Sequence, residues 1–170
     1  MSERLENGRL VKLLVIIDEF TLECLAIDDN QKIKGPDVIE VLRYSFAVRG
    51  EPEFIRSDNG PEFVSHAVKR WLEVSGVKTL YVAPGSPWEN GYVESFNSKL
   101  RDELLNRELF LPLDELRYVT DRWQMDYNHY QPHSSLDYMA PAAFAAKCLE
   151  EGSASLRLPQ EEDTTCDILS

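Results

Sequence analysis

The sequence predicts an α/β fold in which helices flank a mixed sheet. Short runs of apolar and β-branched residues alternate with segments in which apolar residues recur every three or four positions. Glycine and proline separate these segments. A length of 170 residues, with 43% hydrophobic and 28% charged residues, is typical of one globular domain with a single core.

The predicted strands lie in the first half of the chain, at residues 9–17, 22–27, 53–57 and 77–82. The first two are apolar runs joined by the four residues 18–21, so we expect them to pair antiparallel. The charged residues 1–9 are predicted to form a turn. That turn would follow an opening strand that is missing or incomplete here.

The predicted helices are recognised by their apolar spacing and by proline or glycine at their ends. Gly35-Pro36 opens a helix that stops at Gly50, and Pro61 opens a helix that stops at Gly76. A long helix is predicted over about residues 89–108 and a last one over about 113–128. In the long helix, four apolar residues recur at helical spacing and are expected to face the sheet: Val93, Phe96, Leu100 and Leu104.

The charge of the chain is strongly acidic. A net charge of −12 and a pI near 4.7 argue against autonomous binding of nucleic acid. Part of this excess of negative charge is local, because residues 150–170 carry six acidic residues and only one basic residue, Arg157. This segment is predicted to be a disordered acidic tail, and residues 1–149 are expected to form the domain.

The sequence also predicts a cytoplasmic protein without a membrane partner. The longest apolar run, residues 13–17, is far shorter than the roughly 20 residues that cross a bilayer. The first residues are charged and contain no secretory signal. Three widely spaced cysteines without a C-x-x-C pair are interpreted as ordinary thiols: Cys24, Cys148 and Cys166.

Two carboxylates are the strongest candidates for chemistry. Asp58 follows a predicted strand, and Glu94 lies in the first turns of the predicted long helix. Open α/β sheets place their sites at strand ends, and converging carboxylates suit Mg²⁺ or Mn²⁺. The alternative for Asp58 is that it only caps a turn, and for Glu94 that it is a solvated helix residue.

The sequence around these acids resembles the catalytic core of bacterial insertion-sequence transposases and retroviral integrases. The resemblance rests on residues 55–63 (IRSDNGPEF) and 90–97 (NGYVESFN), and 35 residues separate the two acids, as in the D,D(35)E signature. The later residues resemble the segment that follows the core in these transposases: Trp123, 126–128 (DYN), 132–136 (PHSSL), Pro141 and Phe144. The resemblance covers about residues 1–148.

This resemblance implies an RNase H-like fold in which three acids hold two divalent ions, Mg²⁺ or Mn²⁺, and catalyse DNA strand transfer. Asp58 would be the second acid and Glu94 the third, both as metal ligands and catalytic residues. The first acid belongs to a Trp-x-x-Asp pattern that is expected just upstream of Met1. Asp18 is expected to orient neighbouring groups at its strand end or, as the alternative, to substitute for the first acid.

The resemblance also points to DNA as the partner, both transposon ends and target. The residues expected to contact DNA are Arg56, Asn59, Trp88, Asn90, Tyr92, Lys99 and Arg101. Leu22 and Gln131 stand where relatives commonly have arginine, so weaker DNA binding is expected. Further expected partners are other copies of the chain or full-length transposase subunits, in a bacterial cytoplasm and at the nucleoid when DNA is bound.

Two main hypotheses follow for the function. The first is a transposase catalytic core that cleaves DNA and joins the freed 3′ hydroxyl to a target, which would make it a polynucleotidyl transferase. The alternative is an inactive truncated remnant that only interacts with full-length transposase. A third hypothesis, a free-standing RNase H-like nuclease, predicts cleavage without joining.

Overall fold

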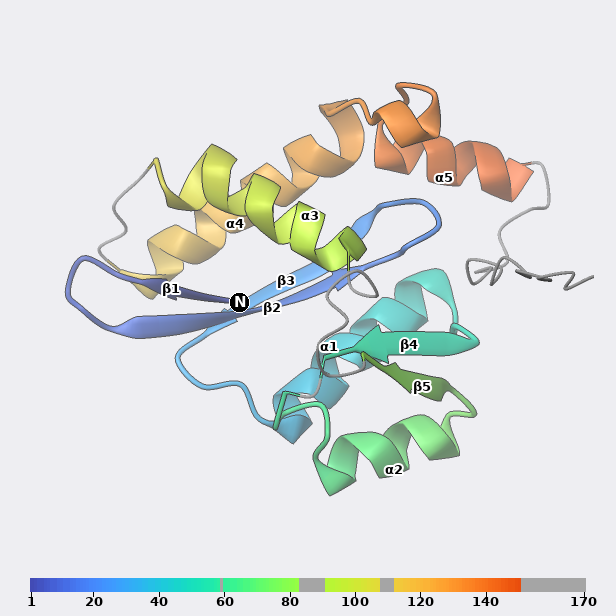
Figure 1. Cartoon of the computed structure of the whole chain (residues 1–170), viewed down its shortest axis with the longest axis horizontal. Coiled ribbons are helices and arrows are strands. Elements are labelled where there is room, and N and C mark those ends of the chain that lie inside the picture. The colour runs from blue at the N-terminus through green and yellow to red at the C-terminus, as the bar shows by residue number, and fades with distance from the viewer. Residues whose placement is uncertain (59, 83–90, 108–111, 151–170) are drawn as a thin grey trace, which may run out of the picture.

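The computed structural model describes residues 1–58, 60–82, 91–107 and 112–150, and Figure 1 shows their arrangement. The elements in chain order are β1 (Ser2–Arg4), β2 (Leu10–Ile17), β3 (Cys24–Asn30), α1 (Gly35–Arg49), β4 (Phe54–Ser57), α2 (His66–Val74), β5 (Lys78–Tyr81), α3 (Gly91–Leu100), the π-helix η2 (Arg101–Leu105), α4 (Leu113–Tyr130), the 3₁₀ helix η3 (Ser134–Leu136) and α5 (Pro141–Glu150).

The strands form two small sheets. In the first sheet the order is β1-β2-β3 and both pairs are antiparallel, as expected for the first two predicted strands. In the second sheet β4 pairs with β5 in parallel. The predicted α/β fold with mixed strand directions is confirmed. Among the described residues, the antiparallel and parallel pairs belong to separate hydrogen-bonded ladders.

Three local predictions were wrong. Residues 2–4, predicted as part of a turn, form β1, and the turn is confined to the residues between Leu5 and Arg9. The second helix begins at His66 rather than Pro61, because Ser65 caps it by accepting a hydrogen bond from the backbone N–H of Val68. The helix predicted over 113–128 is not the last one, since α5 follows it.

The core has two parts, and β2 contributes to both. Leu13 packs with residues of α3, η2 and α4, whereas its neighbour Leu14 packs with residues of α1, α2 and Val77. Successive side chains of a strand point to opposite faces, so β2 is covered on both sides. Figure 1 shows α3 and α4 on one side of the first sheet, and α1, α2 and the second sheet on the other.

The predicted long helix is confirmed over its described part, where α3 continues directly into η2. Phe96, Leu100 and Leu104 are buried as expected, and Val93 is half-buried. Phe96 lies edge-on to two aromatic rings of α4, with ring centroids 5.4 Å from Trp123 and 4.9 Å from Tyr127. These aromatic contacts fix α3 against α4.

No helix in the described part of the chain combines the length and the apolar character that crossing a membrane requires. The predicted acidic tail lies, apart from Glu150, outside the described residues.

Candidate functional site

Asp58 directly follows β4, in the turn that leads to α2. Its side chain is exposed, and Oδ1 accepts a hydrogen bond of 3.0 Å from the backbone N–H of Gly60. A Cβ atom at position 60 would lie 2.9 Å from Asp58 Oδ1 and 3.3 Å from Cδ of Glu62. A side chain at position 60 would therefore require the Asp58 carboxylate to shift, so glycine allows both carboxylates to lie close to this backbone.

Glu62 is a member of this site that sequence reasoning missed. Its Oε1 is 3.7 Å from Nζ of Lys12, whereas Oε2 is buried and makes no hydrogen bond to another described residue. The available signal was an acid four positions after Asp58 within the same turn, but that turn was predicted to be helical. The structure therefore adds a second carboxylate beside Asp58.

A cavity of about 910 Å³ lies at this strand end. Asp58 and Glu62 line it on one side, and Val93 and Asn97 of α3 line it as well. Oδ1 of Asn97 is buried without a hydrogen bond to a described residue. Glu94 is exposed on the same helix and is not among the described residues that line the cavity. Asp58 and Asn97 therefore line the same cavity, whereas the Glu94 side chain does not line its described part.

The donor atoms at this cavity have the chemistry of a site for a hard cation. Asp58 and Glu62 offer carboxylate oxygens, and Asn97 offers an amide oxygen. In the part of the chain that is described, no three His, Cys, Asp or Glu side chains form a group that could hold a metal ion. Mg²⁺, however, is often held by one or two carboxylates and keeps several waters. Asp58 and Glu62, whose side chains both lie close to Gly60, offer the two carboxylates that one such ion needs.

Met1 also lines this cavity. Its amino group donates to the backbone oxygen of Leu13 at 2.9 Å. Burial lowers the pKa of this amino group, while the charges of Asp58 and Glu62 oppose the decrease. The beginning of β1 is therefore next to the carboxylates of the site.

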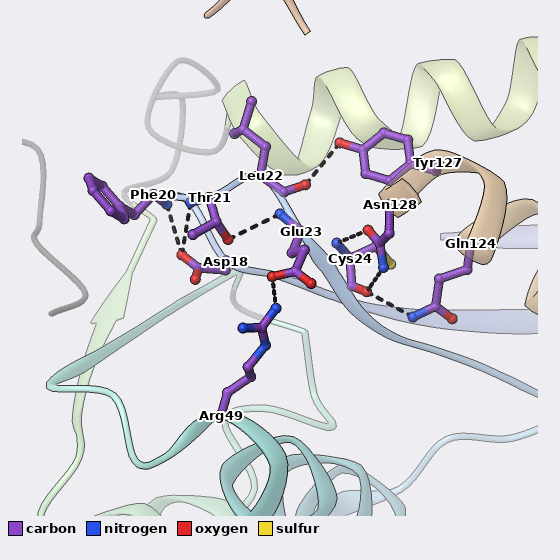
Figure 2. Close-up of polar contacts among 10 residues, drawn as sticks. All are labelled: Asp18, Phe20, Thr21, Leu22, Glu23, Cys24, Arg49, Gln124, Tyr127 and Asn128. Carbon is purple, nitrogen blue, oxygen red and sulfur yellow. Dashed lines mark hydrogen bonds and ion pairs between the residues drawn. The ribbon is translucent and has the colours of Figure 1, made fainter. Parts of the chain in front are cut away.

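Asp18 ends β2 and lines the same cavity. Its Oδ1 accepts hydrogen bonds from the backbone N–H groups of Phe20 at 2.9 Å and Thr21 at 3.3 Å, as Figure 2 shows. A carboxylate that accepts two backbone hydrogen bonds in this way fixes the conformation of a turn. In this structure Asp18 shapes the connection between β2 and β3.

Side chains of helix α4 form hydrogen bonds with the segment that connects β2 to β3 (Figure 2). The side chain of Asn128 accepts from the backbone N–H of Cys24 and donates to the oxygen of Cys24, both at 2.9 Å. Gln124 donates to the same oxygen at 2.8 Å, and the hydroxyl of Tyr127 donates to the backbone oxygen of Leu22 at 3.1 Å. Leu22 has a positive φ of 58°, so these bonds hold a backbone conformation that leucine rarely adopts.

An ion pair between buried Glu23 and a more exposed arginine adds to the same turn. Glu23 pairs with Arg49 in the last turn of α1, as Figure 2 shows. The turn between β2 and β3 is therefore tied both to α4 and to α1. Sequence reasoning assigned no role to this set of contacts, because it joins segments that are far apart along the chain.

The structure describes four of the seven residues that are expected to contact DNA. Asn59, Trp88 and Asn90 lie outside the described residues. Tyr92 is 46% exposed at the start of α3. The structure leaves this ring accessible, and its contact with DNA stays a prediction.

Three basic candidates make contacts within the chain. Arg56 pairs with Glu19 at 3.2 Å, and Arg101 lies 4.0 Å from Glu3. Lys99 lies over the ring of Tyr127, with Nζ 5.6 Å from the centroid. Arg56 and Lys99 are only partly exposed, so they line cavities rather than an open surface.

The two residues noted as departures from the transposase pattern have internal contacts. The backbone oxygen of Leu22 accepts from Tyr127, as described above. Gln131 donates to Oε2 of Glu103 at 2.9 Å, and Trp123 donates to the same oxygen at 3.0 Å. Gln131 therefore joins the end of α4 to η2.

This fold and a carboxylate-lined cavity at the end of β4 define the class of integrase-like catalytic cores. The structure is similar to the catalytic core domain of HTLV-2 integrase in complex with magnesium, with a TM-score of 0.66 and 18% identity over 85% of this chain and 90% of that chain. It is also similar to the catalytic core domain of BIV integrase, with a TM-score of 0.66 and 14% identity over 89% of this chain and 94% of that chain. These likenesses show the fold.

The sequence shows the family. Residues 3–87 match one profile of the integrase core domain, and residues 75–141 match a second profile with the same description. The chain belongs to the integrase core domain family.

Two of its relatives are proteins of bacterial insertion elements. The chain is 43% identical to a protein of insertion element IS407 from Burkholderia multivorans, over 86% of this chain and 53% of the relative. It is 41% identical to a protein of insertion element IS476 from Xanthomonas euvesicatoria, over 85% of this chain and 42% of the relative. The chain therefore spans about half the length of these relatives.

Proposed function

We propose that this chain is the catalytic core of an insertion-sequence transposase, which cleaves DNA at transposon ends and joins the freed 3′ hydroxyl to target DNA. The observation that carries the proposal is the cavity at the end of β4, which is lined by Asp58, by Glu62 and by Asn97 of the helix that bears Glu94. Relatives of the chain from insertion elements support it.

In this proposal Asp58, Glu62 and Asn97 would hold a divalent cation, Mg²⁺ or Mn²⁺, and Glu94 on α3 would be a further ligand. The cation, when bound, polarises phosphodiester oxygens and stabilises the negative charge that develops during in-line displacement. Lys12, which lies 3.7 Å from Glu62, offsets part of the negative charge when the site holds no cation. Asp18 keeps the turn beside the cavity in place.

The first acid expected from the transposase pattern stays a prediction. Met1 lines the cavity that contains Asp58, which is where the pattern requires the strand that bears the first acid. Sequencing the DNA immediately 5′ of the Met1 codon tests it. An in-frame Trp-x-x-Asp would support the assignment, and an upstream region without it in any frame would contradict it.

DNA is the proposed substrate, and other copies of the chain or of a full-length transposase are the proposed protein partners. HTLV-2 integrase cores, which share the fold, are described in trimeric and dimeric forms. The bacterial cytoplasm is the proposed location, because the reaction acts on the chromosome and on the element within it.

Thermal unfolding with and without divalent cation tests the metal site. MgCl₂ or MnCl₂ should raise the melting temperature of the wild-type chain, because a ligand that binds only the folded state stabilises it. The increase should be lost in Asp58→Asn and reduced in Glu94→Gln. Glu73→Gln, which removes an exposed carboxylate of α2, is the matched control and should behave as wild type. Equal melting temperatures with and without cation in the wild-type chain would contradict the proposed site.

A labelled oligonucleotide carrying the terminal sequence of the insertion element tests the reaction. Cleavage followed by joining to a second duplex is the expected result. Cleavage without joining would indicate a nuclease, and the absence of both reactions would indicate an inactive core. Asp58→Asn serves as the control for contaminating nuclease, because it removes a proposed metal ligand without changing the size of the side chain.

A further inference from the structure

The two small sheets leave one edge of β2 and one edge of β4 without a neighbouring strand among the described residues. β2 pairs with β1 only over residues 10–12, so residues 14–17 have a strand, β3, on one side alone. β4 pairs with β5 on one side alone. The cavity of about 910 Å³ is lined by both free edges, residues 14–17 of β2 and Phe54–Ser57 of β4. We call this part of the cavity the interstrand groove.

Side chains of β2 are less buried where β1 no longer lies beside them. Val11, Leu13 and Leu14 are 0%, 2% and 5% exposed. The next three residues, 15–17, are only half-buried, although helices cover both faces of this sheet. The missing neighbour of residues 15–17 is therefore in the plane of the sheet, where a further strand would lie.

The backbone of β2 presents hydrogen-bonding groups to the interstrand groove. Leu13 exchanges two hydrogen bonds of 2.9 Å with Met1 on the β1 side, one through its N–H and one through its oxygen. Backbone groups alternate between the two edges of a strand, so the N–H and oxygen of Val15 and Ile17 point to this same side. Among the described residues, no backbone group bonds to Val15 or Ile17 there.

The backbone of β4 does the same from the opposite side of the groove. The oxygens of Glu53 and Ser57 accept hydrogen bonds of 3.0 and 3.1 Å from the β5 segment. The N–H and oxygen of Phe54 and Arg56 therefore point away from β5 and into the groove. Oγ of Ser57 is also buried without a hydrogen bond to another described residue. Exposed ladder groups of this kind are a template for pairing with another chain.

Two ion pairs fix the relative direction of β2 and β4. Lys12, near the start of β2, is 3.7 Å from Glu62, which follows the end of β4. Arg56, within β4, is 3.2 Å from Glu19, which follows the end of β2. The two strands therefore run in opposite directions along the groove. A strand that extends the antiparallel pairing of β1 would run parallel to β4, with its C-terminal end at Met1.

We propose that the interstrand groove binds an extended apolar segment of a different polypeptide, which adds a strand between β2 and β4 and joins the two sheets. Backbone hydrogen bonds to both edges would hold it, as in β-strand addition. Its side chains would be apolar on both faces, because Leu13 and Leu14 of the adjacent strand pack into a core on either side.

A second copy of the chain is not the proposed occupant. Each strand in the described part of the chain is already paired within a sheet, so a second copy offers no free strand of its own. The inference is separate from the proposed function, since it involves neither DNA nor a cation.

Amide hydrogen exchange, followed residue by residue by NMR in the 170-residue chain, tests the geometry of the added strand. The probe is the peptide acetyl-Lys-Val-Ile-Val-Thr-Val-Lys-amide, whose β-branched residues favour an extended strand. Its addition should slow exchange at the amides of Val15, Ile17, Phe54 and Arg56, because each gains a hydrogen bond. The even-numbered amides of β2 already face β3 and should change little.

Fluorescence anisotropy with the fluorescein-labelled peptide measures its affinity. Phe54→Pro removes one N–H that faces the groove, at the first residue of a strand, where proline is tolerated. It should weaken binding about fivefold or more. Phe54→Val is the matched control, because it removes the same ring but keeps the N–H, and it should bind like wild type. A peptide with proline at its third and fifth positions should not bind, since it lacks two donors.

Several results would overturn the proposal. Equal affinities for the two peptides, or slowed exchange at the even-numbered rather than the odd-numbered amides of β2, would contradict the added strand. The absence of binding at about 1 mM peptide, which covers weak association, would also do so. The comparison of the two peptides uses the wild-type chain and does not depend on the folding of any variant.

Exchange in the free chain identifies other occupants. Val15 and Ile17 amides that are already protected without peptide would contradict an open groove. Protection that grows with protein concentration would identify a second copy as the occupant, and constant protection would identify another part of the same chain.

Discussion

Asp29 lies in β3 against α4, and it is only 2% exposed. Its Oδ2 is 2.6 Å from Oγ1 of Thr120, and this hydroxyl group is also 2.9 Å from the backbone oxygen of Leu116. Thr120 donates to Oδ2 of Asp29, whereas Oδ1 is buried and makes no hydrogen bond to another described residue. The charged form of Asp29 therefore keeps one carboxylate oxygen in the interior without a donor, which favours the neutral form.

Burial raises the pKa of Asp29 from 3.8 to about 6; Asp28 and Asp121 add to the rise, and the hydrogen bond from Thr120 and the charge of Arg117 oppose it. Because the pKa is higher in the folded state, the stability contributed by the protonated group is complete below about pH 4. It is lost as the pH rises through 6. A difference of about two pKa units corresponds to about 3 kcal/mol at the upper limit, at roughly 1.4 kcal/mol per unit.

Asp29→Asn, which is neutral at every pH, should abolish this part of the pH dependence. Urea denaturation at a series of pH values between about 4 and 8 measures the free energy of unfolding. Relative to Asp29→Asn, the wild-type chain should lose up to about 3 kcal/mol as the pH rises over this range. Glu73→Gln, an exposed control in α2, should follow the wild-type curve. Parallel curves for wild type and Asp29→Asn would refute the reasoning.

Three further predictions concern the turn, the core and the site. Asn128→Ala removes two hydrogen bonds of 2.9 Å to the backbone of β3 and should lower the free energy of unfolding, measured in urea, by about 2–4 kcal/mol. Leu100→Ala, at a position 0% exposed, should lower the free energy of unfolding by about 2–5 kcal/mol. Tyr44→Ala, at a position 66% exposed, should change it by less than about 0.5 kcal/mol. Similar losses for both variants would contradict the assigned core. Gly60→Ala places a Cβ atom 2.9 Å from Asp58 Oδ1, so the Asp58 side chain must shift and the increase in melting temperature caused by MgCl₂ should be smaller than in wild type. An equal increase would show that cation binding does not depend on this position of the Asp58 carboxylate.

The sequence by itself determined those features that depend on local spacing. The run of apolar and β-branched residues at 9–17 predicted a strand there, and the helical spacing of Phe96, Leu100 and Leu104 identified the buried face of α3. Asp58 could be placed at a strand end because an apolar run stops directly before a turn signal. Each of these features is set by neighbours within a few residues, where backbone geometry fixes the period.

The tertiary structure determined which residues from distant segments contact one another or line the same cavity. Asn128 binds the backbone of Cys24 across 104 positions of sequence, and no local pattern contains that pairing. Likewise, Asn97 shares a cavity with Asp58, and Lys99 shares another with the serines of η3, only because the sheet and helices pack in this arrangement. Side-chain periodicity reports which face of an element is buried, whereas the identity of the group opposite that face depends on how the elements pack.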